Sequence, residues 1–176
     1  IKNRGIGFLI EKEIQMLEKL LENPERPYLA ILGGAKVSDK IGVIENLIDR
    51  VDAVLIGGAM AYTFLKAKGL PVGKSLVESD KVSYARELMA RFEARNKSIL
   101  LPIDHKVTQD FNSGNCKTTL ADGIDEGWMG IDIGPETVKS YVAAIREAKT
   151  VFWNGPMGVF EKPAFAQGTF EVAKAL

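Results

Sequence analysis

Two lysines four positions apart are the residues of this sequence best suited to chemistry. Lys36 follows the glycine pair Gly33-Gly34, and Lys40 comes about one helical turn later. At this spacing both ammonium groups can reach the mouth of one turn, beside the free amides of a helix start, where anions bind. A cation in the first turn of a helix opposes the helix dipole, so stability alone does not explain Lys40. We interpret the pair as a phosphate clamp; the alternative is that both lysines are merely solvated surface groups.

The segment 154–161, with the sequence NGPMGVFE, combines an amide side chain, a rigid turn and a carboxylate. Glu161 can accept hydrogen bonds from a ribose hydroxyl, and Asn154 can face phosphates. The alternative for Glu161 is a local helix cap or ion pair.

A fold must position these side chains, and three glycine turns indicate its class. Short apolar runs at 29–32, 54–56 and 151–153 lead into Gly33-Gly34, Gly57-Gly58 and the 154–158 turn. In an open parallel sheet, ligands bind at the carboxyl ends of the strands, where glycine lets the backbone approach them closely. Three such turns predict a nucleotide site. For Gly57-Gly58, tight packing of a helix against its strand is an equal alternative.

Apolar spacing predicts alternating strands and helices, hence an α/β fold: a three-layer α/β/α, doubly wound parallel sheet of the Rossmann-like class. The first helix, at 10–21, should pack an apolar stripe, and Ser38 should cap the helix that follows the first glycine pair. The polar segment 107–122 predicts a hairpin or an irregular excursion. The expected strands are 28–32, 51–56, 99–101 and 150–153, and the further helices are 41–48, 59–68, 80–95, 135–148 and one from Pro163.

Composition excludes several classes of function. The chain has 176 residues, 46% of them hydrophobic, which suits one globular domain. Its 23 basic and 23 acidic residues give no overall field for nucleic acid or an anionic membrane. No apolar run is long enough to span a bilayer, and the single cysteine, Cys116, excludes an internal disulfide. We expect a cytoplasmic protein.

Other motifs are weaker. The segment 69–75 (GLPVGKS) resembles a Walker A loop, but it has one residue too few between its glycines and follows a helix, so we interpret it as a connection. No dinucleotide-binding fingerprint follows a strand. His105, the only histidine, has no partner of matching chemistry nearby and is interpreted as a surface or packing residue; no metal-ligand cluster is expected.

Four segments in order, LAILGGAKVSDKI, IGGAMAYTFLK, GWMGIDIGPET and VFWNGPMGVFE, closely resemble the phosphoglycerate kinase family. The resemblance covers the C-terminal, nucleotide-binding domain of that two-domain kinase. It implies reversible phosphoryl transfer from 1,3-bisphosphoglycerate to Mg²⁺-ADP, giving ATP and 3-phosphoglycerate. It also implies that Lys36 and Lys40 lie near the phosphates, with Lys40 neutralising the transferred group. By the same resemblance, the nucleotide site comprises Gly34, Ala35, Lys36, Lys40, Gly57, Gly58, Leu76, Gly130, Asn154, Pro156, Gly158, Val159 and Glu161.

The sequence also departs from the family pattern. The N-terminal domain, which binds 3-phosphoglycerate or 1,3-bisphosphoglycerate, does not appear, and the chain stops before a Gly-Gly-Gly-Asp segment whose aspartate contacts magnesium. Residues 1–4 also differ from what usually precedes the first helix. We therefore expect residues 1–22 to be a linker with the first helix, and 23–176 to be an incomplete nucleotide-binding domain from a monomeric parent. Such a chain is expected to be inactive alone; the alternative is a non-catalytic nucleotide-binding or structural fragment of the same fold.

Overall fold

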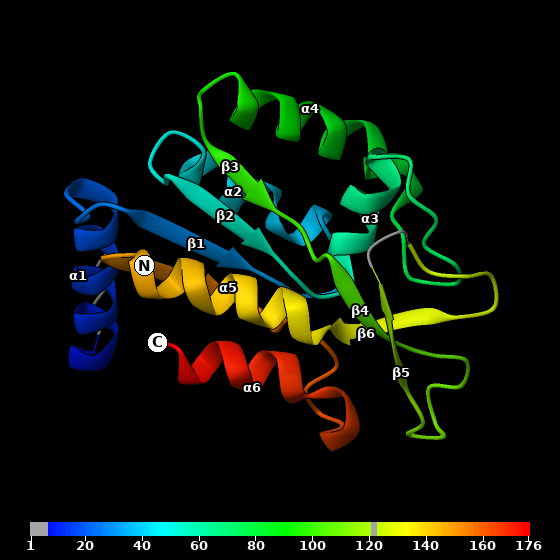
Figure 1. Cartoon of the computed structure of the whole chain (residues 1–176). Coiled ribbons are helices and arrows are strands. Elements are labelled where there is room, and N and C mark those ends of the chain that lie inside the picture. Colours follow the sequence, from blue (N-terminus) through cyan, green and yellow to red (C-terminus); the bar gives the residue numbers. More distant parts are fainter. Residues whose placement is uncertain (1–6, 121–122) are drawn as a thin grey trace, which may run out of the picture.

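A four-stranded parallel sheet forms the centre of the protein (Figure 1). The computed structural model describes residues 7–120 and 123–176. The strands lie in the order β3-β2-β1-β7. Leu32, at the end of β1, is in register with Ile56 of β2 and Asn154 of β7, so the ends of these three strands are level. The strand bounds are Tyr28–Leu32 for β1, Ala53–Ile56 for β2, Ser98–Leu100 for β3 and Thr150–Asn154 for β7.

Alternate side chains of β1 divide the core into two layers. Ala30 and Leu32 belong to the cluster beneath α2, α3 and α4, whereas Leu29 and Ile31 belong to the cluster beneath α5 and α6. Helices therefore cover both faces of the sheet (Figure 1), and the predicted three-layer α/β/α fold is confirmed. The bounds are Ile41–Leu47 for α2, Met60–Ala67 for α3, Val82–Glu93 for α4, Pro135–Glu147 for α5 and Gln167–Lys174 for α6.

A second, three-stranded antiparallel sheet lies beside the first, in the order β5-β4-β6. Its strands are β4 (Asp104–Thr108), β5 (Lys117–Leu120) and β6 (Met129–Ile133). The β4–β5 pair is the hairpin predicted for 107–122, of which residues 121–122 lie outside the described part of the chain. Strand β6 was not predicted, because Gly130 and the buried Asp132 interrupt its apolar residues.

Three predicted helices begin with a 3₁₀ turn: η1 (Ser38–Lys40), η2 (Ser79–Lys81) and η3 (Pro163–Phe165). The prediction that Ser38 caps its own helix is wrong, since the structure gives no side-chain cap at either η1 or α2. Instead, the Ser38 hydroxyl donates to Oε1 of Glu78 at 2.5 Å, and the Ser38 amide donates to Oε2 at 3.1 Å. A carboxylate is the stronger acceptor, so it takes the place of the expected serine cap.

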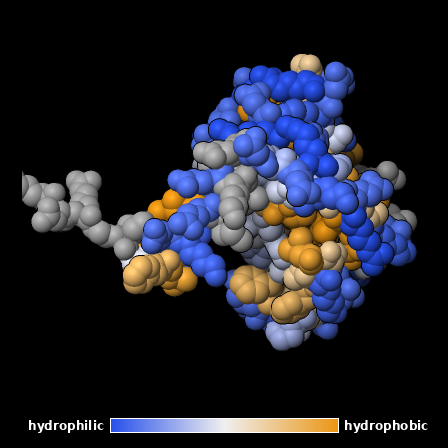
Figure 2. All heavy atoms as spheres, turned by 90° about the vertical axis from the view of Figure 1, so that its left-hand side faces the viewer, coloured by the Kyte–Doolittle hydropathy of each residue, from blue (hydrophilic) through white to orange (hydrophobic). Residues whose placement is uncertain are grey.

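Helix α1 (Phe8–Glu22) forms as predicted, but the described members of its expected apolar stripe do not pack against the rest of the protein. Phe8 and Leu9 are 91% and 72% exposed, and Ile10 and Ile14 of the stripe are exposed as well. The helix stands beside the sheet instead of across either face, and Figure 2 shows its apolar atoms at the surface. The side chains of Leu17, Leu20 and Leu21, and residues 1–6 of the proposed 1–22 segment, lie outside the described structure. No helix within 7–120 and 123–176 is long and apolar enough to cross a membrane.

Candidate functional site

The three glycine turns predicted from the sequence meet at the carboxyl ends of β1, β2 and β7, where backbone hydrogen bonds join them. The Gly33 amide donates to the Asn154 carbonyl at 2.9 Å, and the Gly34 amide donates to the Pro156 carbonyl at 3.0 Å. The Gly58 amide donates to the Met157 carbonyl at 2.8 Å. Because each turn supplies a partner for another, the three form one rigid edge.

This close approach of backbones requires glycine. Gly58 has a φ of +66°, and a Cβ atom there would lie 2.4 Å from the carbonyl oxygen of Gly34. Gly155 has a φ of +91°, and its Cβ would lie 2.3 Å from the carbonyl oxygen of Gly33. Both the conformation and the space therefore exclude a side chain.

A cavity of about 240 Å³ opens at this edge. It brings together eight of the residues that the sequence nominated: Gly34, Ala35, Gly58, Gly130, Pro156, Gly158, Val159 and Glu161. Ala59 and Ile131 also line it and were missed, although each directly follows a nominated glycine in the sequence. Glu161 is in none of the ion pairs found among the described residues, so the alternative of a local ion pair is not seen there.

One wall of the cavity is strand β6, supported from behind by polar groups. The Gly130 amide donates to Oγ of Ser75 at 2.9 Å, and a Cβ on Gly130 would lie 2.0 Å from the Tyr62 hydroxyl oxygen. Burial raises the pKa of Tyr62, and the charge of Asp132 raises it further, so the hydroxyl stays neutral. The Val159 amide donates to the Ile131 carbonyl at 2.9 Å, which joins this wall to the 156–161 turn.

The two lysines differ in their surroundings. The ammonium group of Lys40 donates to Oδ1 of Asn154, and its Cε lies 3.6 Å from the position of a Cβ on Gly34. Lys40 therefore folds back over the first glycine turn and meets the end of β7. Lys36 is exposed and does not line the cavity.

Five nominated residues lie outside the cavity lining: Lys36, Lys40, Asn154, Gly57 and Leu76. Gly57 is buried against Met157, with its hypothetical Cβ 2.3 Å from the sulfur, a position that fits the packing alternative. Leu76 is 51% exposed in the loop between α3 and η2.

The weaker motifs of the sequence, segment 69–75 and His105, have structural roles in the fold. The Walker-like segment 69–75 is a turn in which Val72 bridges to Ile124, as expected of a connection. His105 is buried with its ring centroid 5.5 Å from that of Tyr62, and burial lowers its pKa to about 4, so it is a packing residue. Within the described ranges, no group of three or more His, Cys, Asp or Glu side chains is placed to hold a metal ion.

The parallel sheet with helices on both faces defines a doubly wound α/β protein. The phosphoglycerate kinase family model matches residues 1–176, and the chain belongs to this family. It is 62% identical to the phosphoglycerate kinase of Bdellovibrio bacteriovorus over 177 residues and 56% identical to that of Clostridium perfringens over 176 residues. Each alignment covers 100% of this chain and 44% of the relative, so the chain spans less than half the length of these proteins.

Solved structures of phosphoglycerate kinases match the fold of this chain. The phosphoglycerate kinase of Coxiella burnetii matches with a TM-score of 0.91 and 40% identity, over 96% of this chain and 44% of that one. The enzyme of Pyrococcus horikoshii matches with a TM-score of 0.83 and 36% identity over the same shares.

Proposed function

We propose that this chain is the nucleotide-binding part of a phosphoglycerate kinase, and that Mg²⁺-ADP and Mg²⁺-ATP bind in the cavity at the carboxyl edge of the sheet. The observation that carries the proposal is the cavity lining itself. Backbone from three glycine turns and β6 surrounds a space beside Glu161, with Lys40 at its first turn. This is the crevice in which doubly wound sheets bind nucleotides.

Each group has a role that its position suits. The glycines of the walls carry no side chain, so the cavity admits a flat base and backbone amides can approach it, while the Glu161 carboxylate accepts hydrogen bonds from the ribose. Lys36, Lys40 and Asn154 face the phosphates. Gly57 and Leu76 help to form the nucleotide site from the adjoining turn and loop.

The reaction proposed for the full-length protein is reversible phosphoryl transfer between 1,3-bisphosphoglycerate and ADP, a step of glycolysis. The transferred group carries its charge on oxygen atoms, so transfer depends on positioning and electrostatic stabilisation more than on a strong base. Lys40 supplies a fixed positive charge for this purpose. Magnesium arrives with the nucleotide, and the carboxyl-phosphate substrate binds outside this chain, in the N-terminal domain that the resemblance implies. We further propose a monomeric, cytoplasmic parent protein, in keeping with the free cysteine.

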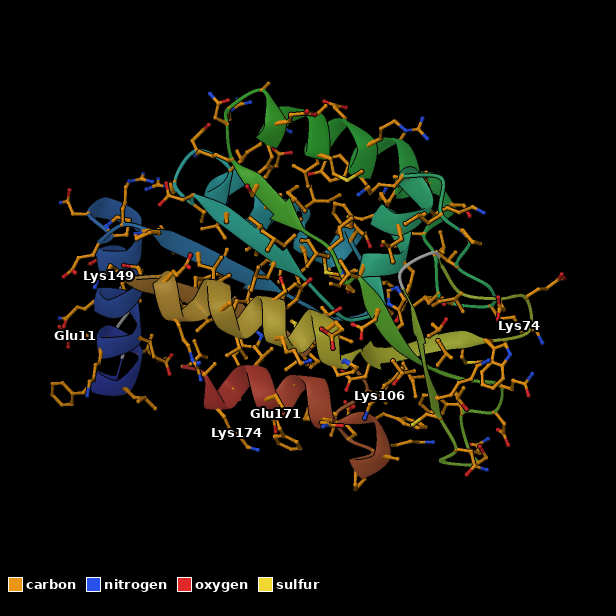
Figure 3. All side chains as sticks on the ribbon, viewed as in Figure 1. Glu11, Lys74, Lys106, Lys149, Glu171 and Lys174 are labelled. Carbon is orange, nitrogen blue, oxygen red and sulfur yellow. The ribbon has the colours of Figure 1, made fainter. Side chains whose placement is uncertain are left out.

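Calorimetric titration with magnesium-ADP tests the proposal. Glu161→Ala and Lys36→Ala should each weaken binding about tenfold, the loss expected for one charge-assisted contact. Glu171→Ala, which removes an exposed carboxylate on α6 (Figure 3), is the matched control and should bind like the parent. A folded parent protein that does not bind magnesium-ADP would refute the proposal. The isolated chain should show no turnover, because the proposed site for the acyl phosphate lies in the N-terminal domain and the transfer then has no enclosed, water-excluding cleft.

A further inference from the structure

Asp132 on β6 is a buried carboxylate, 1% exposed, that forms no ion pair within the described structure. Its Oδ2 accepts a hydrogen bond from the Gly168 amide at 2.7 Å, and its Oδ1 accepts one from the Ile133 amide at 2.9 Å. Burying a charge with only two amide donors destabilises a fold. Such a group is a candidate for a functional role.

Two glycines pack directly on this carboxylate. A Cβ on Gly158 would lie 2.3 Å from Oδ1 of Asp132, and a Cβ on Gly168 would lie 2.4 Å from the same atom. Gly158 lines the cavity, so the Asp132 carboxylate lies immediately behind the cavity wall.

The same carboxylate also belongs to a set of hydrogen bonds that hold this wall in place from two sides. The 157–159 turn is held from β6 by the bond between the Val159 amide and the Ile131 carbonyl. It is held from α6 by the Met157 amide, which donates to Oγ1 of Thr169 at 3.0 Å. Because Asp132 binds the Gly168 amide, it fixes the start of α6 to β6 and thereby fixes the turn from its second side.

Few charges face Asp132. Lys106 of β4 is its register partner, but the Lys106 ammonium donates to Oε1 of Gln167 at 2.7 Å, at the start of α6 (Figure 3). Tyr62 of α3 also interacts with Asp132 and is neutral. The 167–169 and 157–159 segments carry no titratable side chain. Burial therefore dominates over the Lys106 charge and raises the pKa of Asp132 to about 6.

We propose that Asp132 is a positioning residue for the nucleotide: its charged carboxylate holds α6, and through it the Gly158–Val159 wall, at the spacing from β6 that binding requires. This inference rests on the proposed nucleotide site and adds a residue that does not itself touch the ligand. Protonation of Asp132 weakens its hold on the Gly168 amide, so affinity falls with pH. The fold does not lose stability through this group, because its folded-state pKa lies above the ordinary value and the fold favours the protonated form.

Asp132→Asn tests the proposal, with Asp49→Asn as the matched control at an exposed carboxylate paired with Arg95. At about pH 7.5, Asp132→Asn should bind magnesium-ADP at least about fivefold more weakly than the parent, and the difference should vanish near pH 5, where the parent is protonated. ADP titrates in the same range, but equally for all three proteins, so the ratio of affinities isolates Asp132. The melting temperature of Asp132→Asn should equal or exceed that of the parent, because a buried charge is removed.

A measurement without ligand separates this inference from the proposed function. Hydrogen exchange of the Met157 and Gly168 amides should be faster in Asp132→Asn than in the parent or in Asp49→Asn. Equal exchange, or equal affinity across the pH range, would overturn the inference. A lower melting temperature would also overturn it, since Asp132 would then be a structural group. Failure of every protein to bind nucleotide would refute the proposed function, and the exchange rates would still decide the role of Asp132.

Discussion

The ammonium group of Lys40 donates a hydrogen bond to the side-chain oxygen of Asn154, which lies 114 positions later in the chain. The bond crosses from the segment after β1 to the end of β7 and fixes a lysine beside the first glycine turn. Its acceptor is a neutral amide oxygen, which orients the ammonium group without neutralising it. The positive charge is therefore not neutralised by this bond and is free to face the phosphates of the proposed nucleotide.

This relationship predicts that charge at position 154 controls nucleotide binding. Asn154→Asp keeps the shape of the side chain but pairs Lys40 with a carboxylate, which also repels phosphate. We expect this variant to weaken magnesium-ADP binding by at least about tenfold, and more than Asn154→Ala does. Titration calorimetry measures both variants, with Asn46→Asp at an exposed position of α2 as the control. Equal affinities for Asn154→Asp and Asn154→Ala would show that magnesium-ADP binding does not depend on an unneutralised charge at Lys40.

Much of the sheet could be predicted because its signals are local. Strand β1 is a continuous apolar run ending in two glycines, and the structure places it at 28–32 as predicted, with all five residues buried. The glycine turns of the cavity were found for the same reason. Each is a short sequence pattern, and the level register of the strand ends brings the patterns together.

The features that the sequence did not reveal depend on partners far along the chain. The carboxylate of Glu78, not the side chain of Ser38, accepts the hydrogen bond of the backbone amide at the start of η1, from 40 positions away. The side chains of Ser75 and Asp132 support the cavity from outside the glycine turns, and only the folded chain brings them there. Apolar periodicity describes one element at a time, so it carries no information on such pairs.

A glycine comparison tests whether the wall behind the cavity is as closely packed as the structure indicates. Gly158→Ala would place a methyl group 2.3 Å from the Asp132 carboxylate, which requires a backbone movement. We expect a loss of about 1–3 kcal/mol of stability, as for other overpacked sites, together with weaker nucleotide binding. Gly42→Ala in α2 has no atom within 4 Å of the new methyl and should gain about 0.5–1 kcal/mol. Urea denaturation measures both, and similar stabilities for the two variants would contradict the prediction.

The start of α5 depends on Asp104, a buried residue of β4. Its carboxylate accepts hydrogen bonds from the Glu136 amide at 2.9 Å and from the Thr137 amide at 2.8 Å, and from the Thr137 hydroxyl at 2.6 Å. Asp104→Ala leaves the two amides without an acceptor, while the Thr137 hydroxyl keeps the Asp104 carbonyl oxygen at 3.1 Å; the change should cost about 2 kcal/mol or more. Chemical denaturation provides the measurement, and Asp49→Ala is the exposed control. A cost no larger than that of the control would mean that water replaces the lost acceptor.

His105 makes the stability of the protein depend on pH. Its Nδ1 is buried without a hydrogen-bond partner, and burial lowers its pKa from 6.5 to about 4. Between these values the unfolded chain binds the proton and the folded chain does not, so stability is lost as the pH falls from 6.5 to 4. Asp132 acts in the opposite sense, since its pKa is raised from 3.8 to about 6. The two effects offset each other over the window that they share.

His105→Phe removes the contribution of His105 to the pH dependence of stability and keeps an aromatic ring beside Tyr62. Relative to the parent, the variant should gain on the order of 3 kcal/mol of unfolding free energy as the pH falls from about 7 to about 4. Other titrating groups are common to both proteins and cancel in the difference. Urea denaturation at a series of pH values measures that difference, and the value near pH 7.5 reports the packing effect of the ring alone. A difference that stays constant over the whole range would show that His105 titrates alike in the folded and unfolded chains.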